Sequence, residues 1–323
     1  MKPPIRAVGL LSGGLDSALA VKLLLEQGIE VIGLHLESPT ACRSDVRELA
    51  RELGITLVVR EKGEEYLRLL RHPRWGYGRN MNPCLDCRLF MFQLAKPCME
   101  EHGAQFLFTG EVVGQRPMSQ MRDRMALVDR QSGLVGLILR PLSARLLDET
   151  EPERRGWVDR SRLLAITGRQ RTEQLALAVR YGLQHVQSPG GGCLLTDPRF
   201  AERLRGLFED LPEERTTLDD LALLRLGRVF RVSAALRIVI GRDREENLKL
   251  KDFESKGRWL VEPLDFAGPS ALVCGPRGEE SLGHAIDLIA RHSRAPSPQH
   301  VVRWKDDDGV RSRVLGAAAS DSA

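Results

Sequence analysis

Two groups of residues in this chain could do chemistry: a glycine-rich turn near the N-terminus and three of the six cysteines. The turn, Ser12-Gly13-Gly14-Leu15-Asp16-Ser17, stands between an apolar run and a helical pattern. Backbone N–H groups at a helix N-terminus bind anions, and glycines let the backbone approach a phosphate closely. The serine hydroxyls add donors, and Asp16 could position Mg²⁺ or cap the helix. We therefore predict a phosphate site here, with an ordinary strand–helix turn as the alternative.

Cys84 and Cys87 form a CxxC at the end of a turn-rich stretch, and Cys193 ends the glycine-rich loop 188–193. Thiolates are nucleophiles and soft metal ligands, so these three residues could carry sulfur or hold a metal centre. Six scattered cysteines are too few for a disulfide framework in a chain of 323 residues. The other three are interpreted as structural: Cys42, Cys98 and Cys274.

The elements that must position these residues alternate between strands and helices, which is typical of a parallel sheet flanked by helices. Strands are predicted over 5–11, 30–36, 56–59, 106–109 and 134–139. Helices are predicted over 15–27, over 44–53 with Ser44 as its cap, and over 88–101 with a kink at Pro97. Two short helices are expected within 157–183. Residues 60–87 are predicted as one long loop that ends in the CxxC.

A second module without this alternation follows a helix predicted over 198–208 and a linker over 211–215. Its strands are predicted over 228–231, 235–240 and 270–274, and its helix over 281–292. The tail from residue 306 is small and polar, and we predict that it is disordered. The expected domains are 1–200, 201–305 and the tail 306–323.

Length and composition limit the number of domains and the class of protein. At roughly 150 residues per domain, 323 residues indicate about two domains with a sizeable core. No apolar run approaches the ~18 residues of a membrane span, and the first residues do not resemble a signal peptide. We therefore expect a cytoplasmic protein that has no membrane partner. Basic residues number 48 and acidic residues 44, which permits a nucleic-acid partner without requiring one.

The SGGLDS turn after the first strand resembles the PP-loop of the ATP pyrophosphatase superfamily. The resemblance implies an α/β fold with a doubly wound parallel sheet of the adenine nucleotide α-hydrolase-like type, together with a smaller α+β domain. It also implies that ATP and Mg²⁺ bind and that a substrate oxygen is adenylated with release of pyrophosphate. The nucleotide-binding residues that it implies are Ser12, Gly13, Gly14, Asp16, Ser17, His35, Leu36, Gly110 and Glu111. For His35, a buried hydrogen-bonded histidine is the alternative.

A larger resemblance, over residues 5 to about 200, is to tRNA thiouridine synthases of the PP-loop class. Its segments are SGGLDS, NPCLDC, TGEVVGQRPMSQ and SPGGGCLL. It implies that Cys84, Cys87 and Cys193 deliver sulfur and act as catalytic residues together with Asp16. Three cysteines could hold a 4Fe-4S cluster with one open iron. Three alternatives remain open: a metal-free persulfide relay, in which Cys193 carries the sulfur and a CxxC thiol resolves the disulfide, a zinc site, and inert buried cysteines.

The span from Arg225 to Arg258 concentrates positive charge, with ten basic and five acidic residues. Such a surface neutralises phosphates, although a solvated strand face is the alternative. GRVFRV and IVIGRDREEN also resemble the RNA-binding module of NFACT proteins. The predicted RNA-binding residues are Arg225, Arg228, Arg231, Arg242 and Lys249. In the first domain, the segment 115–120 and Arg140 could guide RNA or the triphosphate, or be ordinary surface charges.

The expected function is that of an ATP-dependent tRNA sulfurtransferase that forms AMP, pyrophosphate and a thiouridine. Its expected partners are tRNA and a sulfur donor, either sulfide or the persulfide of a cysteine desulfurase, and a homodimer is possible. Two alternatives remain: a PP-loop synthetase or amidotransferase that acts on a small molecule, and a non-catalytic RNA-binding adaptor that binds ATP. The modified uridine atom, 2-thio or 4-thio, stays open.

Overall fold

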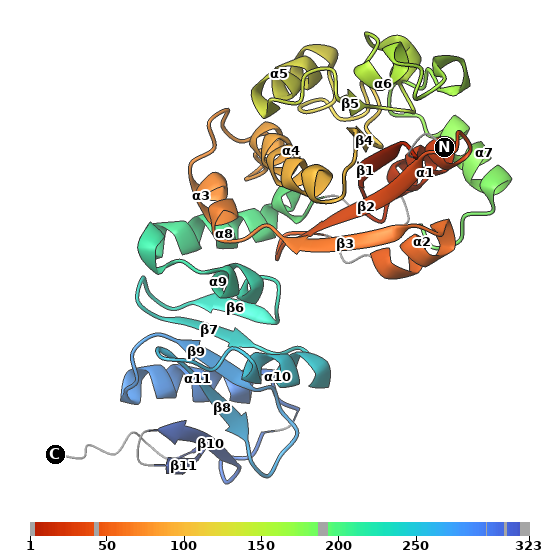
Figure 1. Ribbon diagram of the computed structural model, residues 1–323. Coiled ribbons are helices and arrows are strands. Elements are labelled where there is room, and N and C mark those ends of the chain that lie inside the picture. Colours follow the sequence, from red (N-terminus) through yellow and green to blue (C-terminus); the bar gives the residue numbers. More distant parts are fainter. Residues whose placement is uncertain (1–3, 42–44, 187–192, 295, 307–308, 317–323) are drawn as a thin grey trace. The chain divides into compact units, whose positions relative to one another are not determined.

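The computed structural model describes residues 4–41, 45–186, 193–294, 296–306 and 309–316. The chain divides into two compact units, Met1–Asp197 and Pro198–Ala323, which are considered separately (Figure 1). This division lies three residues before the boundary expected after residue 200. No helix in the described part of the chain is long and apolar enough to cross a membrane.

The first unit is built on a five-stranded sheet in which every neighbouring pair is parallel. Its strands are β1 (Arg6–Leu10), β2 (Glu30–Glu37), β3 (Thr56–Glu61), β4 (Phe106–Thr109) and β5 (Ile138–Leu139). The strand order is β3-β2-β1-β4-β5. The chain thus builds outward from β1 on one side and then crosses to β4 on the other. This confirms the doubly wound parallel sheet.

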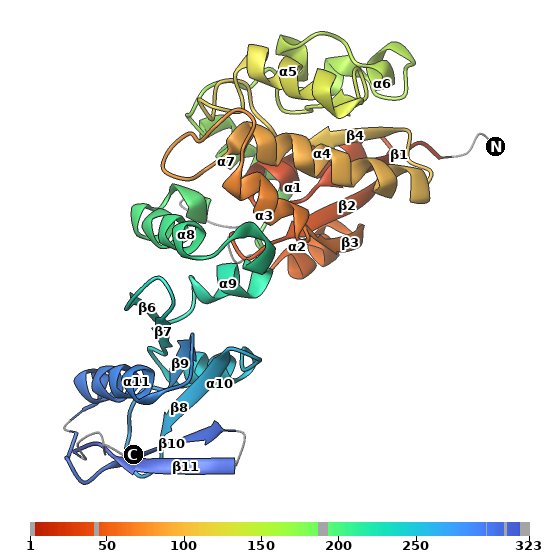
Figure 2. The ribbon, with the colours of Figure 1, turned by 90° about the vertical axis from the view of Figure 1, so that its left-hand side faces the viewer.

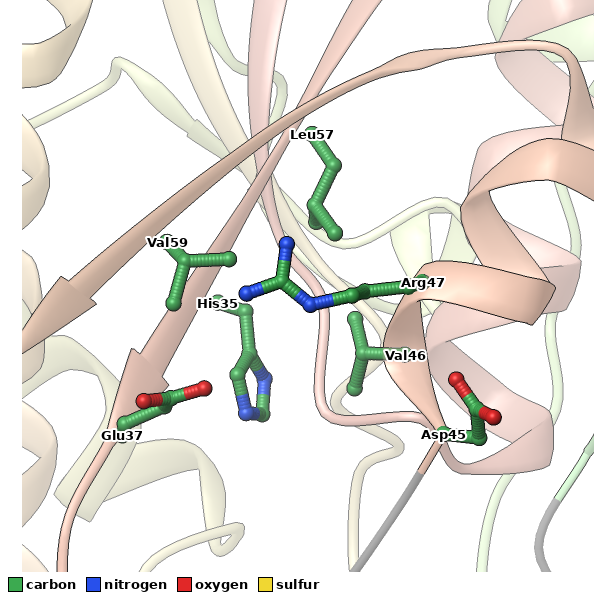
Figure 3. A pocket seen from close by; sticks show the side chains of 7 residues that line it. All are labelled: His35, Glu37, Asp45, Val46, Arg47, Leu57 and Val59. Atoms are coloured by element: carbon green, nitrogen blue, oxygen red, sulfur yellow. The ribbon is translucent and has the colours of Figure 1, made fainter.

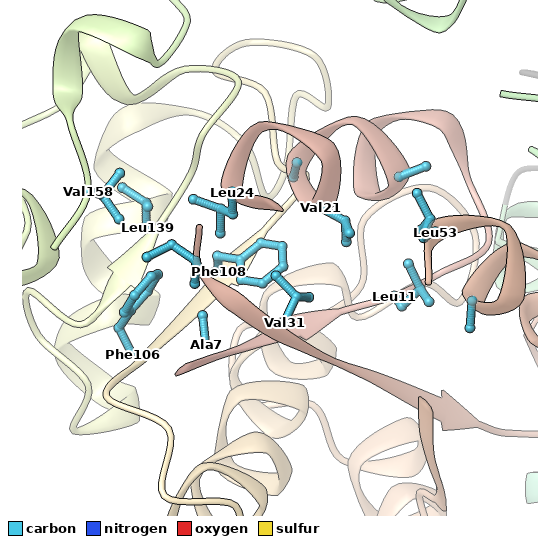
Figure 4. Close-up of a cluster of buried hydrophobic side chains, with 14 of the residues drawn as sticks. Ala7, Leu11, Val21, Leu24, Val31, Leu53, Phe106, Phe108, Leu139 and Val158 are labelled. Atoms are coloured by element: carbon cyan, nitrogen blue, oxygen red, sulfur yellow. The ribbon is translucent and has the colours of Figure 1, made fainter. Parts of the chain in front are cut away.

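Helices cover both faces of this sheet because its strands are apolar on both sides. On one face, Ala7 and Val31 pack with α1 (Leu15–Leu25) and α2 (Val46–Leu53), as Figure 4 shows. On the other face, Val8 and Ile32 pack with α4 (Cys84–Glu101) and α5 (Arg122–Ser132). Successive strand residues therefore alternate between two cores. Figure 2 shows α4 lying along the sheet.

The helix α4 begins at Cys84, so the CxxC forms its first turn instead of ending the preceding loop. Pro97 lies inside this helix, which continues to Glu101. The predicted loop 60–87 also contains α3 (Glu65–Arg71), which buries Tyr66, Leu67 and Leu70. This short apolar face was hidden by the turn residues that follow it. The long-loop prediction is therefore wrong at both ends.

Several smaller predictions need correction. Asp45 caps α2 by accepting a hydrogen bond from the Glu48 amide at 3.1 Å, whereas Ser44 lies outside the described residues. The last strand of the sheet is two residues long instead of six. In the first unit, α5 and α6 (Glu151–Arg154) were also not predicted. The segment 157–183 holds the 3-10 helix η2 (Arg160–Arg162) and α7 (Thr172–Tyr181). Other 3-10 helices are η1 (Ala144–Leu146), η3 (Leu194–Thr196) and η4 (Glu213–Arg215).

The second unit is an α+β domain with a six-stranded antiparallel sheet in the order β11-β10-β8-β9-β7-β6. Its strands are β6 (Arg228–Arg231), β7 (Arg237–Ile240), β8 (Arg258–Pro263), β9 (Ala271–Cys274), β10 (Val301–Asp306) and β11 (Gly309–Val314). Its helices are α8 (Pro198–Asp210), α9 (Leu218–Leu223), α10 (Arg244–Lys251) and α11 (Glu279–His292). The last of these packs on one sheet face, against Ile238 and Val261.

The strand β11 corrects the prediction that residues 306–323 form a disordered tail, because Gly309–Val314 pairs with β10. Residues 307–308 and 317–323 lie outside the described part. The small residues at the end of the chain hid the preceding stretch, in which Val310 and Val314, four residues apart, lie on one face of the strand.

Candidate functional site

A cavity of about 290 Å³ lies at the carboxyl ends of β1, β2 and β4. In a doubly wound sheet, helices leave neighbouring strands in opposite directions where the strand order reverses, and a crevice opens at that point. Here the order reverses between β1 and β4. The predicted residues that line the cavity are Ser12, Gly14, Asp16, Ser17, His35, Leu36, Gly110, Glu111, Cys84, Cys87 and Cys193. Segments separated by more than 180 residues in the sequence therefore meet at one site.

The glycine-rich turn is held in shape by its two serines. The Ser17 hydroxyl donates to the Gly14 carbonyl at 2.8 Å, and the Ser12 and Ser17 hydroxyl oxygens are 3.3 Å apart. Gly13 has a φ of 79°, a left-handed conformation that favours glycine. No side chain caps α1 at Gly14, so the first amides of the helix remain available to a ligand. This arrangement suits an anion such as a phosphate group.

Asp16 is anchored through one carboxylate oxygen only. Its Oδ2 accepts a hydrogen bond from the Gln115 amide at 2.8 Å and lies 3.8 Å from the Arg171 guanidinium. The other oxygen, Oδ1, is buried and has no hydrogen-bond partner. A buried carboxylate oxygen without a partner is costly unless a ligand satisfies it. Asp16 therefore fits the predicted role as a Mg²⁺ ligand at the cavity.

Gly110 is required by the close approach of two backbones. A Cβ atom at this position would lie 2.4 Å from the Asp16 carbonyl carbon and 2.5 Å from the Ser17 nitrogen. The turn after β4 can therefore touch the start of α1 only if residue 110 has no side chain. Glycine at this position therefore allows the glycine-rich turn and the end of β4 to approach each other closely.

Glu111 is completely buried in a network of charges. Its carboxylate pairs with Arg88 at 2.9 Å and with Arg140 at 3.0 Å. Burial by itself raises the pKa of Glu111, but the charges of Arg88 and Arg140 outweigh it and hold the pKa below its ordinary value. Arg140 also forms a bidentate pair with Asp129, at 2.7 and 2.8 Å. Arg140 is thus a buried positioning residue, and the expectation of a guide for RNA or an ordinary surface charge is wrong.

His35 lines this cavity and also a neighbouring one of about 400 Å³. Its Nδ1 lies 2.8 Å from the Leu11 carbonyl oxygen, so the ring donates there and its orientation is fixed. In the neighbouring cavity Arg47 reaches from α2 toward His35 and Val59 (Figure 3). The histidine is hydrogen-bonded, as the alternative supposed, and it also faces both cavities.

Cys84, Cys87 and Cys193 lie close enough for their charges to interact. Burial raises the pKa of Cys193 to about 11, and it raises the pKa of Cys84 as well. Cys87 has a different neighbour, because the Lys62 ammonium donates to its Sγ at 3.4 Å. The same ammonium lies 4.4 Å from the centre of the Tyr66 ring. Burial, followed by the charges of Cys87 and Cys193, raises the pKa of Tyr66.

Cys193 is brought to the CxxC by two hydrogen bonds between distant loops. The Asn80 amide donates to the Thr196 carbonyl oxygen at 2.6 Å, and the Met81 backbone N–H donates to the Leu195 carbonyl oxygen at 3.2 Å. Upstream, Glu52 accepts from the backbone amides of Gln184 and His185 at 2.7 and 2.9 Å. Both ends of the segment that contains the predicted loop 188–193 are therefore attached to the first unit. Residues 188–192 themselves lie outside the described part.

The three thiols supply the donors for a metal cluster in one place. Within the described residues, however, no group of three His, Cys, Asp or Glu is arranged as a metal site. Cys98 is buried in the sheet core, in agreement with a structural role, and Cys274 lies in β9 of the second unit. Cys42 lies outside the described residues.

The predicted RNA-binding residues of the second unit are largely paired with acids. Arg231 pairs with Asp210 at 2.5 Å, and Arg237 shares the same carboxylate. Arg242 and Lys249 pair with Glu246 and Glu245. Arg228 is exposed and has no ion-pair partner among the described residues. Arg225 precedes β6 and its side chain is half-buried. The span is thus less positive at its surface than its composition suggests.

Sequence reasoning missed three cationic residues that line the cavity: Lys62, Arg88 and Arg171. Arg116 also lines it and lies in the segment 115–120, which was expected to guide RNA or the triphosphate. Arg88 directly follows the CxxC, which was the available signal. Lys62 directly follows β3, and polar residues at the carboxyl ends of parallel strands are candidates for the site. Nothing in the sequence pointed to Arg171, because only the packing of α7 against α1 brings it close to Asp16.

Two parts of the chain match known families. Residues 5–149 match the family described as thiamine biosynthesis protein (ThiI), and residues 227–321 match the NFACT protein RNA binding domain. Among the curated relatives, a probable tRNA sulfurtransferase of Thermococcus kodakarensis is 30% identical over 146 residues, which is 42% of this chain and 36% of the relative. A tRNA-specific 2-thiouridylase MnmA of Pelobacter propionicus is 32% identical over 111 residues, which is 31% of each chain.

The aligned part thus spans about a third of the length of these relatives. A solved 4-thiouridine synthetase in complex with RNA and ATP is similar over 65% of this chain and 52% of that chain, with 23% identity and a TM-score of 0.40. The first family match contains the glycine-rich turn, the CxxC and Gly110, and the second contains the antiparallel sheet from β6 onward. Residues 5–149 are therefore similar to the ThiI family, and residues 227–321 are similar to the NFACT protein RNA binding domain.

Proposed function

We propose that this protein is an ATP-dependent tRNA sulfurtransferase that converts a uridine carbonyl into a thiocarbonyl. The observation that carries the proposal is that the SGGLDS turn and three cysteines from two distant segments line one cavity. A phosphate site alone would suit many reactions. A phosphate site that faces three thiols suits a reaction that activates an oxygen with ATP and then replaces it with sulfur. The names of the curated relatives support the same assignment.

In the first step, the uridine carbonyl oxygen attacks the α-phosphorus of ATP, and pyrophosphate leaves. The amides at the start of α1 and the serine hydroxyls bind the phosphates, while Asp16 Oδ1 would hold Mg²⁺, which neutralises phosphate charge when bound. Arg88, Arg116 and Arg171 line the same cavity and add positive charge. Catalysis here consists mainly of positioning and electrostatic stabilisation.

In the second step, a sulfur nucleophile attacks the adenylated carbon and AMP leaves with the oxygen. In the persulfide form of this step, a donor such as a cysteine desulfurase first transfers sulfur to Cys193. The terminal sulfur attacks the uridine carbon, a CxxC thiol attacks the remaining Cys193 sulfur, and the resulting disulfide is reduced by an external dithiol. Lys62 Nζ lies 3.4 Å from Cys87 Sγ, so a cation stands beside this CxxC thiol.

The alternative carrier is a 4Fe-4S cluster held by Cys84, Cys87 and Cys193. These residues provide the correct donor type and number on one cavity wall, although the described side chains are not arranged as a metal site. When bound, such a cluster would supply an open iron position for sulfide. The two carriers use the same cysteines, so they are distinguished by iron content and not by mutagenesis.

The partners follow from this chemistry. A tRNA would reach the cavity while the NFACT-type domain contacts its backbone. The sulfur donor would be sulfide or a protein persulfide. The protein would work in the cytoplasm, where tRNA is modified and where free thiols, such as the five described here, persist.

The test combines pyrophosphate release with nucleoside analysis. The full-length protein should release pyrophosphate from ATP faster with tRNA, and mass spectrometry of the tRNA should detect a thiouridine. Cys84→Ser, Cys87→Ser and Cys193→Ser should abolish thiolation, whereas the matched control Cys274→Ser outside the cavity should not. Iron-free, colourless protein with full activity would support the persulfide route.

Other outcomes would point to the alternatives. Pyrophosphate release that is unaffected by tRNA would favour a small-molecule synthetase. Binding of tRNA and ATP without any turnover would favour an adaptor. Either result would contradict the proposal.

A further inference from the structure

Two loops of the first unit form an exposed surface beside the cavity. One is 72–82, which leads into α4, and the other is 116–121, which leads into α5 at Arg122. The loops touch, because a Cβ atom added at Gly78 would lie 3.2 Å from Cγ of Met118. Arg116, Ser119 and Asn82 from these loops line the cavity itself. The surface is therefore the edge of the cavity, and we call its exposed residues the rim: Tyr77, Arg79, Arg116, Met118, Met121 and Arg122.

The rim combines large apolar side chains with cations. The exposed fractions of Tyr77, Met118 and Met121 are 39%, 42% and 44%. These are three of the ten large apolar side chains that are exposed in the described part of the chain. Within the described residues, Arg79 and Arg122 have no carboxylate partner. Exposed apolar groups among unpaired cations are typical of surfaces that bind single-stranded nucleic acid.

The loop 72–82 of the rim is held by hydrogen bonds. The Tyr77 hydroxyl donates to the Leu70 carbonyl oxygen at 2.6 Å, which fixes the position of the ring, and 39% of the residue is exposed. The carboxylate of Asp86, which lies between the two cysteines of the CxxC, accepts hydrogen bonds from the backbone amides of Arg74 and Trp75 at 2.7 and 3.3 Å. The same loop is joined to α5 by the Arg74 guanidinium, which donates to Gln131 Oε1 at 3.0 Å. A ring that is held in place loses little entropy when a base stacks on it.

We infer that the rim binds the RNA strand that carries the target uridine, with the Tyr77 ring as a stacking platform and Arg79, Arg116 and Arg122 as phosphate contacts. This inference rests on the proposed function and adds a second RNA surface, on the catalytic unit itself. A uridine carbonyl can reach Cys84 and Cys193 only if the base leaves its stack and enters the cavity. The neighbouring base then loses a stacking partner, which an aromatic ring at the cavity edge replaces.

The test measures tRNA affinity of the full-length protein by fluorescence anisotropy across a series of salt concentrations. Tyr77→Ala should weaken binding by about 5- to 150-fold, the range for loss of one stacked base, and Tyr77→Trp should restore it. Arg79→Ala with Arg122→Ala should weaken binding and lower the salt slope by roughly 0.7 to 0.9 for each lost phosphate contact. Two exposed residues away from the cavity lining serve as matched controls, Val179→Ala and Arg145→Ala, and should bind like wild type.

The outcomes separate this inference from the proposed function. Rim variants that bind tRNA as tightly as wild type overturn the inference, whether or not the protein makes thiouridine. A wild-type protein whose tRNA binding depends on the rim but which makes no thiouridine supports the inference and contradicts the function. Rim variants that bind tRNA normally and use sulfide, but no longer accept sulfur from a protein persulfide, would show that the rim binds the sulfur donor protein. This result would overturn the inference.

Discussion

The side-chain amide of Asn80 donates a hydrogen bond of 2.6 Å to the carbonyl oxygen of Thr196, 116 residues away in the sequence. Asn80 stands four residues before Cys84, and Thr196 stands three residues after Cys193. This bond and the neighbouring one from Met81 to Leu195 set the position of Cys193 relative to the CxxC. Asn80 has a φ of 56°, a left-handed conformation that asparagine tolerates better than most residues.

Replacement of Asn80 should slow the formation of a disulfide between Cys193 and the CxxC. Asn80→Asp preserves the shape but replaces the amide donor with a carboxylate that faces a carbonyl oxygen. We expect slower disulfide formation between Cys193 and the CxxC, by roughly tenfold if the bond contributes about 1 to 1.5 kcal/mol to their approach. Peptide mapping after mild oxidation measures this rate.

Asn80→Gly is the matched control for backbone strain, because glycine adopts a positive φ without cost. It also lacks the amide, so it should slow the disulfide as Asn80→Asp does. Unchanged disulfide rates in both variants would show that the bond does not position Cys193.

Glu52 predicts a pH dependence of stability. Burial tends to raise its pKa, but hydrogen bonds from the Gln184 and His185 backbone amides, and then His185 itself, outweigh this and lower the pKa below 4.5. A lowered folded pKa contributes stability that is present above the unfolded value and is lost as the pH falls through the folded value. Glu52→Gln should therefore reduce the unfolding temperature at pH 7 but have progressively less effect below pH 4.5. Thermal unfolding at several pH values measures the difference, and a constant difference would contradict this prediction.

Gly110→Ala should disrupt the nucleotide site. The added Cβ would meet backbone atoms of Asp16 and Ser17 at 2.4 to 2.5 Å, and backbone cannot rotate away as a side chain can. We expect a loss of about 1 to 3 kcal/mol or more in the free energy of unfolding, together with loss of ATP binding in calorimetry. Gly283→Ala is the control, because it lies in α11 with no atom within 4 Å of its added Cβ and should be neutral or stabilising. Unimpaired ATP binding by Gly110→Ala would refute the close approach.

Arg140→Met should be severely destabilising although Arg140 contacts no predicted ligand. The change leaves the buried Glu111 with only one of its two arginine partners and frees Asp129. Removal of one partner from a buried ion pair typically costs about 3 to 5 kcal/mol. Chemical denaturation measures this loss. Replacement of the exposed Arg155 by Met should cost far less, because its pair with Glu151 is exposed to solvent.

The basic span of the second unit should contribute unevenly to RNA binding. Arg228 is exposed without an ion-pair partner among the described residues, whereas Arg231 is already paired with Asp210. Arg228→Ala should therefore lower the salt slope of tRNA binding by about 0.7 to 0.9, and Arg231→Ala should lower it less. Equal slopes for the two variants would mean that the pair with Asp210 opens when RNA binds.

Several features of this protein follow from its sequence alone, because they depend on local patterns. SGGLDS marks a turn between a strand and a helix, since glycine conformation and helix amides are local properties. The apolar runs of β1, β2 and β4 indicate buried parallel strands. The short α3 and the strand β11 escaped notice because neighbouring turn residues and a polar tail dominated their composition.

Only the tertiary structure decided which distant residues meet. The count of three cysteines is visible in the sequence, but their meeting depends on hydrogen bonds between Asn80 and Thr196 and on the reversal of strand order beside β1. The sequence likewise shows a charge excess from Arg225 to Arg258, while only the folded chain pairs Arg231 with Asp210 and buries Arg140 between two carboxylates. Composition counts charges, whereas electrostatic interactions depend on distance and burial, and these are set by long-range packing.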